Sequence, residues 1–161
     1  MFEGIPNDEL SVNRNNYSYP TVVAAGEGGA DVLESYLLHQ NVINDMLLSA
    51  LDEDVVNGYL TIIFWGFYAG ADNIVRENRA WARYTMARNG INELGDNHAA
   101  AIVRDATVEI NNNNYSEALS IITNLPQSGF AFASKVCAFI NPSDCAYSGD
   151  CEHLFRPNVN T

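Results

Sequence analysis

The sequence predicts an all-α protein, built as a multi-helix bundle. Apolar residues recur at helical spacing along most of the chain, and clusters of Asn, Gly and Pro separate these stretches from one another. No strand-like alternation of apolar and polar residues persists long enough to indicate a sheet. With 161 residues, 47% of them hydrophobic, the chain is long enough to bury the core of one domain.

The apolar spacing and the helix breakers together define the expected elements. Acidic residues at 52–54 suit a helix N-terminus, Asn89-Gly90 suits a left-handed helix cap, and the four asparagines at 111–114 interrupt a helix. We therefore expect helices over residues 30–52, 55–69, 71–88, 91–110, 115–123 and 130–140. We expect a flexible N-terminal segment over 1–29, a single helical domain over 30–155 with a hairpin-like element at 114–142, and a tail at 156–161.

The charge distribution bears on the class of partner. Twenty acidic and eight basic residues give a net charge of −12, whereas a protein that binds nucleic acid usually carries a basic surface. The charge is uneven, because residues 1–70 hold ten acids and one base, while residues 71–90 hold two acids and four arginines. An anionic partner would meet the 71–90 segment or the hairpin.

Several absences in the sequence exclude other classes. Three cysteines without a Cys-x-x-Cys pair argue against a disulfide framework and a structural zinc site, and the three histidines share no ligand spacing. We expect no metal and no other cofactor. The first residues have no basic region followed by an apolar stretch, and the apolar run at 55–71 is shorter than a usual membrane span. These features predict a cytoplasmic protein without a membrane partner.

Residues 125–133 read Leu-Pro-Gln-Ser-Gly-Phe-Ala-Phe-Ala. This segment resembles the hairpin of helix-hairpin-helix DNA glycosylases, whose pattern is Leu-Pro-Gly-apolar-Gly-x-x-x-Ala. The continuation through Asn141-Pro142 resembles uncharacterised bacterial proteins of the 8-oxoguanine DNA glycosylase fold, and the overlap covers residues 114–150. Within the pattern, Leu125, Pro126, Gly129 and Ala133 match, whereas Gln127 and Ser128 depart from it.

The resemblance implies a C-terminal helix-hairpin-helix-like element and a DNA-repair activity, the cleavage of the N-glycosidic bond of a damaged base. In such a hairpin the turn leads into a helix whose first N–H groups have no internal partner, and these donors bind a DNA phosphate. The damaged base is meanwhile flipped into a pocket. DNA contacts are thereby implied for Gln127, Ser128 and Gly129. The alternative is an ordinary tight turn between two helices of a bundle.

Lys135 is the sole lysine and lies on the apolar helix expected at 130–140. Such a lysine either reaches solvent along the helix edge or is desolvated with a lowered pKa. The second case suits a Schiff-base nucleophile, since only the neutral amine attacks the sugar carbon. The catalytic lysine of the family would align with Ala131, one helical turn earlier. The resemblance also implies a catalytic aspartate after this helix, for which Asp150 is the best placed and Asp144 is the second candidate.

Arg76, Arg79 and Arg83 share one face of the helix expected at 71–88, because they lie three and four residues apart. They would contact DNA phosphates, or they form an exposed face that pairs with acids such as Asp72 and Glu77. Two functions therefore stay open. The chain is a glycosylase-like protein whose partner is damaged DNA, or a non-catalytic acidic helical domain that mediates protein–protein interaction.

Overall fold

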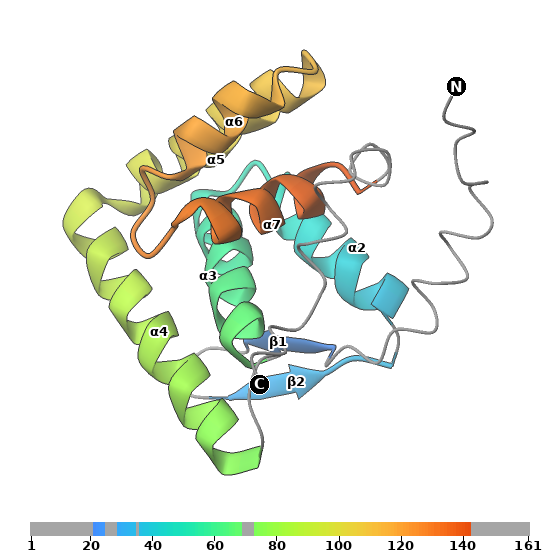
Figure 1. Cartoon of the computed structure of the whole chain (residues 1–161), viewed down its shortest axis with the longest axis vertical. Coiled ribbons are helices and arrows are strands. Elements are labelled where there is room, and N and C mark those ends of the chain that lie inside the picture. The colour runs from blue at the N-terminus through green and yellow to red at the C-terminus, as the bar shows by residue number, and fades with distance from the viewer. Residues whose placement is uncertain (1–20, 25–28, 35, 69–72, 143–161) are drawn as a thin grey trace, which may run out of the picture.

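The computed structural model describes residues 21–24, 29–34, 36–68 and 73–142. This part of the chain is mostly helical and carries one small antiparallel pair of strands (Figure 1), so the expected all-α bundle is confirmed. The elements are β1 (Val22–Ala24), β2 (Ala30–Val32), α2 (Tyr36–Leu47), α3 (Asp52–Tyr68), α4 (Asn73–Leu94), α5 (Asp96–Asn111), α6 (Tyr115–Ile122) and α7 (Phe130–Ile140). Of the flexible segment expected at 1–29, residues 1–20 and 25–28 lie outside the described residues, as does the tail expected at 156–161.

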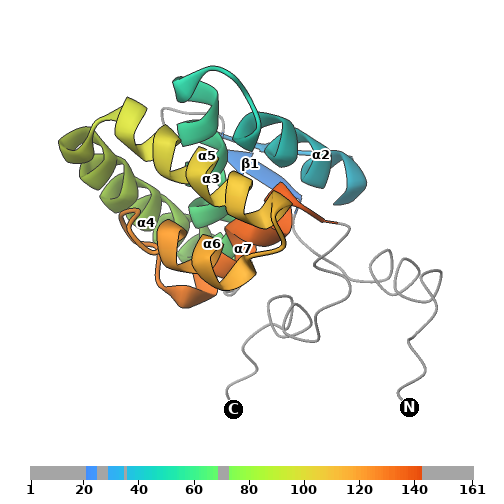
Figure 2. The same ribbon diagram turned by 90° about the horizontal axis from the view of Figure 1, so that it is seen from above.

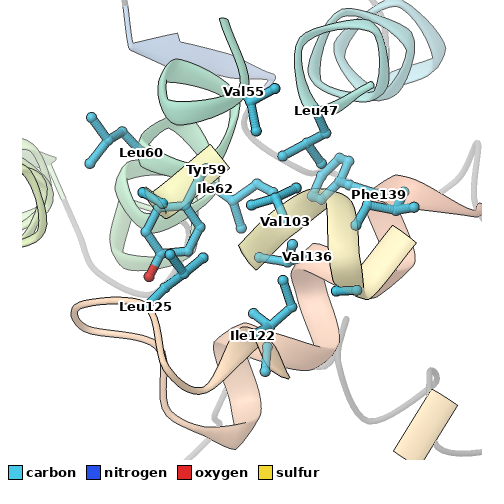
Figure 3. Packing of buried hydrophobic residues seen from close by; sticks show 14 of the residues in the cluster. Leu47, Val55, Tyr59, Leu60, Ile62, Val103, Ile122, Leu125, Val136 and Phe139 are labelled. Carbon is cyan, nitrogen blue, oxygen red and sulfur yellow. The ribbon is translucent and has the colours of Figure 1, made fainter. Parts of the chain in front are cut away.

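Helix α3 is the centre of the bundle, and α2, α4, α5, α7 and β1 all pack against it (Figure 2). Its acidic first turn is followed by a stretch that is buried on nearly every side, as expected for a helix without a polar face. Figure 3 shows how Tyr59 and Ile62 of this helix meet Val103 of α5 and Val136 of α7 in the main core. No helix within the described ranges is long and apolar enough to cross a membrane.

The two strands were not expected. They pair with Val22 opposite Val32, although the sequence places the first strand in the flexible segment 1–29 and the second in a helix over 30–52. Val22 is buried against α3, whereas Val32 is 77% exposed, and α2 begins only at Tyr36. Three-residue strands are too short to show alternation, and the surface that covers β1 comes from α3, far along the chain.

Helix α4 also departs from its expected end. It continues through Asn89-Gly90 and ends at Leu94. The next residue, Gly95, has a φ of 95°, which lies in the left-handed region. Gly90 has a different role, because a Cβ placed there would lie 2.6 Å from the Cβ of Pro126. The glycine lets the α6–α7 loop approach the helix, and a sequence pattern cannot distinguish this role from that of a cap.

Helix α5 begins at Asp96 and not at the expected residue 91, because residues 91–94 belong to α4, but α5, α6 and α7 each end within one residue of the expected position. The asparagine run ends α5 and includes Asn113 in the left-handed region, with a φ of 59°. Helix α7 has the expected bounds, and Asn44 of α2 completes its C-terminus. The Asn44 side-chain amide donates to the carbonyl oxygens of Phe139 and Ile140 at 2.8 and 2.9 Å. These carbonyls have no partner within the helix, so Asn44 supplies a cap from a distant segment.

His39 on α2 holds β1 to the bundle. Its ring is fully buried between Trp65 and Phe139, with centroids 5.9 Å from each, and its Nε2 lies 3.0 Å from the carbonyl oxygen of Val22. Nε2 is the donor in this bond, because a carbonyl oxygen only accepts. Nδ1 is buried with no partner among the described residues, and burial lowers the pKa of His39. The fold therefore favours the neutral ring.

This burial predicts a loss of stability in mild acid. Since the folded pKa lies below 6.5, the contribution of neutral His39 is complete above pH 6.5 and is lost as the pH falls through the folded value. His39→Gln keeps a donor for Val22 but does not titrate. Between pH 6.5 and the folded pKa, the wild type should lose up to about 1.4 kcal/mol per pH unit relative to His39→Gln in urea denaturation. His98→Gln, at an exposed site, is the control. The prediction would be contradicted if the difference in free energy of unfolding between the wild type and His39→Gln stayed constant with pH.

Candidate functional site

Lys135 projects from α7 onto two aromatic rings. Its ammonium lies 4.6 Å from the ring centre of Phe132 and 5.9 Å from that of Trp65 on α3. Gly66 makes this approach possible, because a Cβ at that position would lie 3.3 Å from the Lys135 nitrogen and 2.5 Å from the Phe132 ring. The side chain is half-buried, and desolvation lowers the pKa of Lys135. No carboxylate of a described residue lies within 4.0 Å of it.

The Phe132 ring connects Lys135 to two of the predicted arginines. Phe132 stacks on Phe67 of α3 with 4.9 Å between ring centres and 25° between ring planes. The guanidinium carbons of Arg79 and Arg83 on α4 lie 5.4 and 5.1 Å from the centre of the Phe67 ring. These distances are those of cation–π contacts. Helices α4 and α7 thus bring three cations to one pair of stacked rings, to which α3 contributes Phe67. We call this group the cation–aromatic cluster (Arg79, Arg83, Lys135, Phe67 and Phe132).

The cluster differs from the other basic side chains of the described region. Arg88 pairs with Asp96 at 3.2 Å, and Arg104 pairs with Asp52 at 2.6 Å. By contrast, no ion pair joins any cation of the cluster to a described carboxylate, Glu77 included. Of the acids expected to neutralise the arginine face, Asp72 lies outside the described residues, as does the side chain of Arg76. Where the structure describes this face, its arginines contact rings instead of acids.

The α6–α7 loop is anchored to the bundle at several points. Leu125 is buried, and the Tyr59 hydroxyl donates to the carbonyl oxygen of Pro126 at 2.6 Å. Arg83 donates to the side-chain oxygen of Gln127 at 3.2 Å, which joins the loop to the cation–aromatic cluster. Gln127 has a φ of 66°, a left-handed conformation that favours glycine, at the position where the hairpin pattern has its first glycine. The loop is therefore a fixed turn.

The residues expected to contact DNA have different exposures. Gly129 is exposed at the start of α7, with no described atom within 4 Å of where a Cβ would lie. Ser128 is buried, so its side chain lies beneath the surface. Ala131, where the family would have its lysine, is exposed. Asp150 and the second candidate Asp144 lie outside the described residues.

The aromatic part of the cluster was not identified from the sequence. Phe67 follows directly on a buried apolar run, so its pattern indicates only a core residue. Its stacking on Phe132 joins positions that are distant in sequence. For the contact between α4 and Phe67, the sequence offered only the spacing of Arg79 and Arg83. This spacing predicts that the two arginines share a helix face, but it does not predict the ring beneath them.

The described residues include no group of three His, Cys, Asp or Glu side chains placed to hold a metal ion. Cys137 is buried in α7, while Cys145 and Cys151 lie outside the described ranges. Comparison of the chain with protein-family models, with curated proteins and with solved structures found no match.

Proposed function

We propose that the protein is a DNA-repair-like protein that cleaves the N-glycosidic bond of a damaged base, with Lys135 as the nucleophile. The observation that carries the proposal is the setting of the Lys135 amine, which is half-buried against Phe132 and Trp65 without a described carboxylate partner. Because burial lowers the pKa of Lys135, a larger share of the amine is neutral near neutral pH. A neutral amine is the reactive form of a Schiff-base lysine.

The chemistry follows from this amine. The Lys135 nitrogen attacks C1′ of the damaged nucleotide, and the electron pair of the glycosidic bond leaves with the base, which takes up a proton. The amine then loses its two protons as the C1′–O4′ bond of the sugar breaks, O4′ takes up a proton, and a covalent imine joins Lys135 to the sugar. Asp150 would stabilise the positive charge that develops on the sugar, a role that rests on the resemblance alone.

Borohydride trapping tests this proposal directly. The reagent reduces the imine and leaves the protein covalently attached to DNA, and no other lysine is present to substitute for Lys135. On a panel of oxidised bases and abasic sites, the wild type should form the trapped species and Lys135→Gln should lose it. The α-amino group of Met1 is blocked in both proteins. Asp150→Asn should retain DNA binding and slow trapping, because a charge-stabilising carboxylate acts mainly in the transition state.

Two variants separate catalysis from folding. Lys135→Arg keeps a cation over the Phe132 ring but has no nucleophilic amine, so it should fold like the wild type and fail to trap. The pair Ala131→Lys with Lys135→Gln moves the lysine to the exposed position that the family would use. The absence of a trapped species with the wild type, or equal trapping by wild type and Lys135→Gln, would remove Lys135 as the nucleophile.

A second candidate is a non-catalytic helical domain that binds another protein. The observations that favour it are the net charge of −12 and the side chain of Phe130, which is 70% exposed in the first turn of α7. Retention on immobilised DNA at low salt distinguishes the two functions. Retention that falls steeply with salt supports the first, because phosphate contacts release counterions. No retention supports the second.

A further inference from the structure

The cation–aromatic cluster gathers three cations that have no carboxylate partner among the described residues. Arg79 and Arg83 lie four residues apart on α4, and like charges at this spacing destabilise a helix. The chain has twenty acidic residues, and two arginines outside the cluster, Arg88 and Arg104, each have a carboxylate partner. A shortage of acids is therefore not the reason that no described carboxylate pairs with Arg79, Arg83 or Lys135. An anion that binds to the cluster would relieve their repulsion.

We infer that Arg79, Arg83 and Lys135 form one binding site for the phosphates of a single nucleic-acid strand, built on the Phe67–Phe132 stack. The successive contacts measure 5.1 Å from Arg83 to Phe67, 4.9 Å between the rings and 4.6 Å from Phe132 to Lys135. The two arginines of α4 and the lysine of α7 thus contact the same pair of stacked rings. This inference goes beyond the proposed function, because it concerns the protonated form of Lys135, whereas the proposed nucleophile is the neutral amine, and it requires no chemistry at Lys135.

The size and charge of the site favour a single strand over a duplex. A duplex-binding protein typically neutralises about six to ten phosphates, and the surface around such a contact is strongly basic. The cluster offers three cations on a chain with a net charge of −12, so a long duplex contact would bring phosphates close to acidic residues. A flexible strand can place a few phosphates on a small site, and cations beside aromatic rings are the usual surface for such strands.

The architecture also holds the cations in place. The hydrogen bond from Arg83 to Gln127 fixes one guanidinium against the α6–α7 loop, and Gly66 sets the depth at which Lys135 lies on α3. Side chains fixed before binding lose less conformational entropy when the ligand arrives. Phe67 and Phe132 orient the three cations; they are positioning residues, because their rings are stacked on each other.

The test uses a short, undamaged, fluorescently labelled oligothymidylate. Its affinity is measured by fluorescence anisotropy from about 25 to about 200 mM potassium chloride. Each neutralised phosphate of a single strand contributes about −0.7 to the slope of log K against log salt, so three contacts predict a slope of roughly −2. Arg79→Gln, Arg83→Gln and Lys135→Gln should each weaken binding at low salt and make the slope shallower by about 0.7.

The control is Arg104→Gln, which removes the same charge from an arginine that pairs with Asp52 outside the cluster. Arg104→Gln should leave the salt slope unchanged. Arg79→Lys should restore most of the affinity and of the slope that Arg79→Gln loses, because lysine restores the positive charge. Circular dichroism verifies that each variant folds. Equal losses in Arg104→Gln and Arg79→Gln, or no binding by the folded wild type at the lowest salt, would overturn the inference.

Inorganic phosphate provides the second arm. If it displaces the oligonucleotide at comparable concentrations of phosphate groups, the site takes free phosphate, and the assignment to a strand is wrong. This binding test is independent of the proposed function, because the oligonucleotide carries no damaged base that could be cleaved. Binding with the expected slopes but no borohydride trapping would leave the phosphate site and remove the glycosylase. Borohydride trapping by the wild type, together with salt slopes that are unchanged in all three variants, would leave the glycosylase and remove the phosphate site.

Discussion

Phe139→Ala should lower the free energy of unfolding by about 3–5 kcal/mol, the usual cost of truncating a fully buried phenylalanine. The side chain is only 2% exposed, and its ring meets Trp65 edge-on, with 5.5 Å between ring centres and 88° between ring planes. It also contacts the ring of His39. Truncation would leave a cavity where α2, α3 and α7 meet, lined by large rings that cannot collapse to fill it.

Phe130→Ala is a matched control for this prediction. It removes the same side chain from the same helix, but Phe130 is 70% exposed, so the expected change is within about 0.5 kcal/mol. Urea denaturation of the two variants measures both values against the wild type. A loss below about 1 kcal/mol for Phe139→Ala would place this end of α7 at the surface and weaken the case for a desolvated Lys135.

Gly90→Ala should destabilise the protein by about 1–3 kcal/mol, which is the cost of overpacking a filled site. In an exposed helix interior the same change stabilises by up to about 1 kcal/mol, because glycine is a poor helix former. Here the new methyl group would lie 2.6 Å from Cβ and 2.8 Å from Cγ of Pro126. The loop cannot yield easily, since Leu125 is buried and the Pro126 carbonyl accepts a hydrogen bond from Tyr59.

The test of this prediction is whether Gly90→Ala lowers or raises the stability of the protein. Asn89→Ala, at the exposed neighbouring position of the same helix, should be neutral or slightly stabilising in thermal denaturation. Combining Gly90→Ala with Pro126→Gly removes the atoms in the way, so the two effects should be less than additive. If Gly90→Ala stabilises the protein, then Gly90 is an ordinary helix residue and the close approach of the loop is wrong.

The segment from Leu125 to Ile140 shows how much local chemistry can specify. Residues 125–129 were expected to form a tight connection, and α7 begins at Phe130 and ends at Ile140 as predicted. Proline, glycine and asparagine act through their own backbone dihedral angles, so their effect on the chain does not depend on distant partners. The same reasoning explains why the asparagine run after α5 ended that helix where it was expected to.

The candidate site shows the opposite case. The sequence identified Lys135, Arg79 and Arg83 separately, as a helix lysine and as two arginines on one face. Their meeting on the Phe67–Phe132 stack depends on the packing of α3 against both α4 and α7. Spacing along a helix specifies which residues share a face but not which other helix covers that face. The desolvation of Lys135 follows from that packing as well.

The amino-acid sequence alone determined the helical class, the position of the central helix and the turn before α7, because each depends on residues within a few positions of one another. Only the tertiary structure decided that Gly90 lies inside a helix, that Val22 belongs to a strand and that three cations share one aromatic stack. Each of these depends on a contact between segments far apart in the chain: Gly90 with Pro126, Val22 with His39, and Phe67 with Phe132. Such contacts arise from close packing of the whole core, which local propensity does not encode.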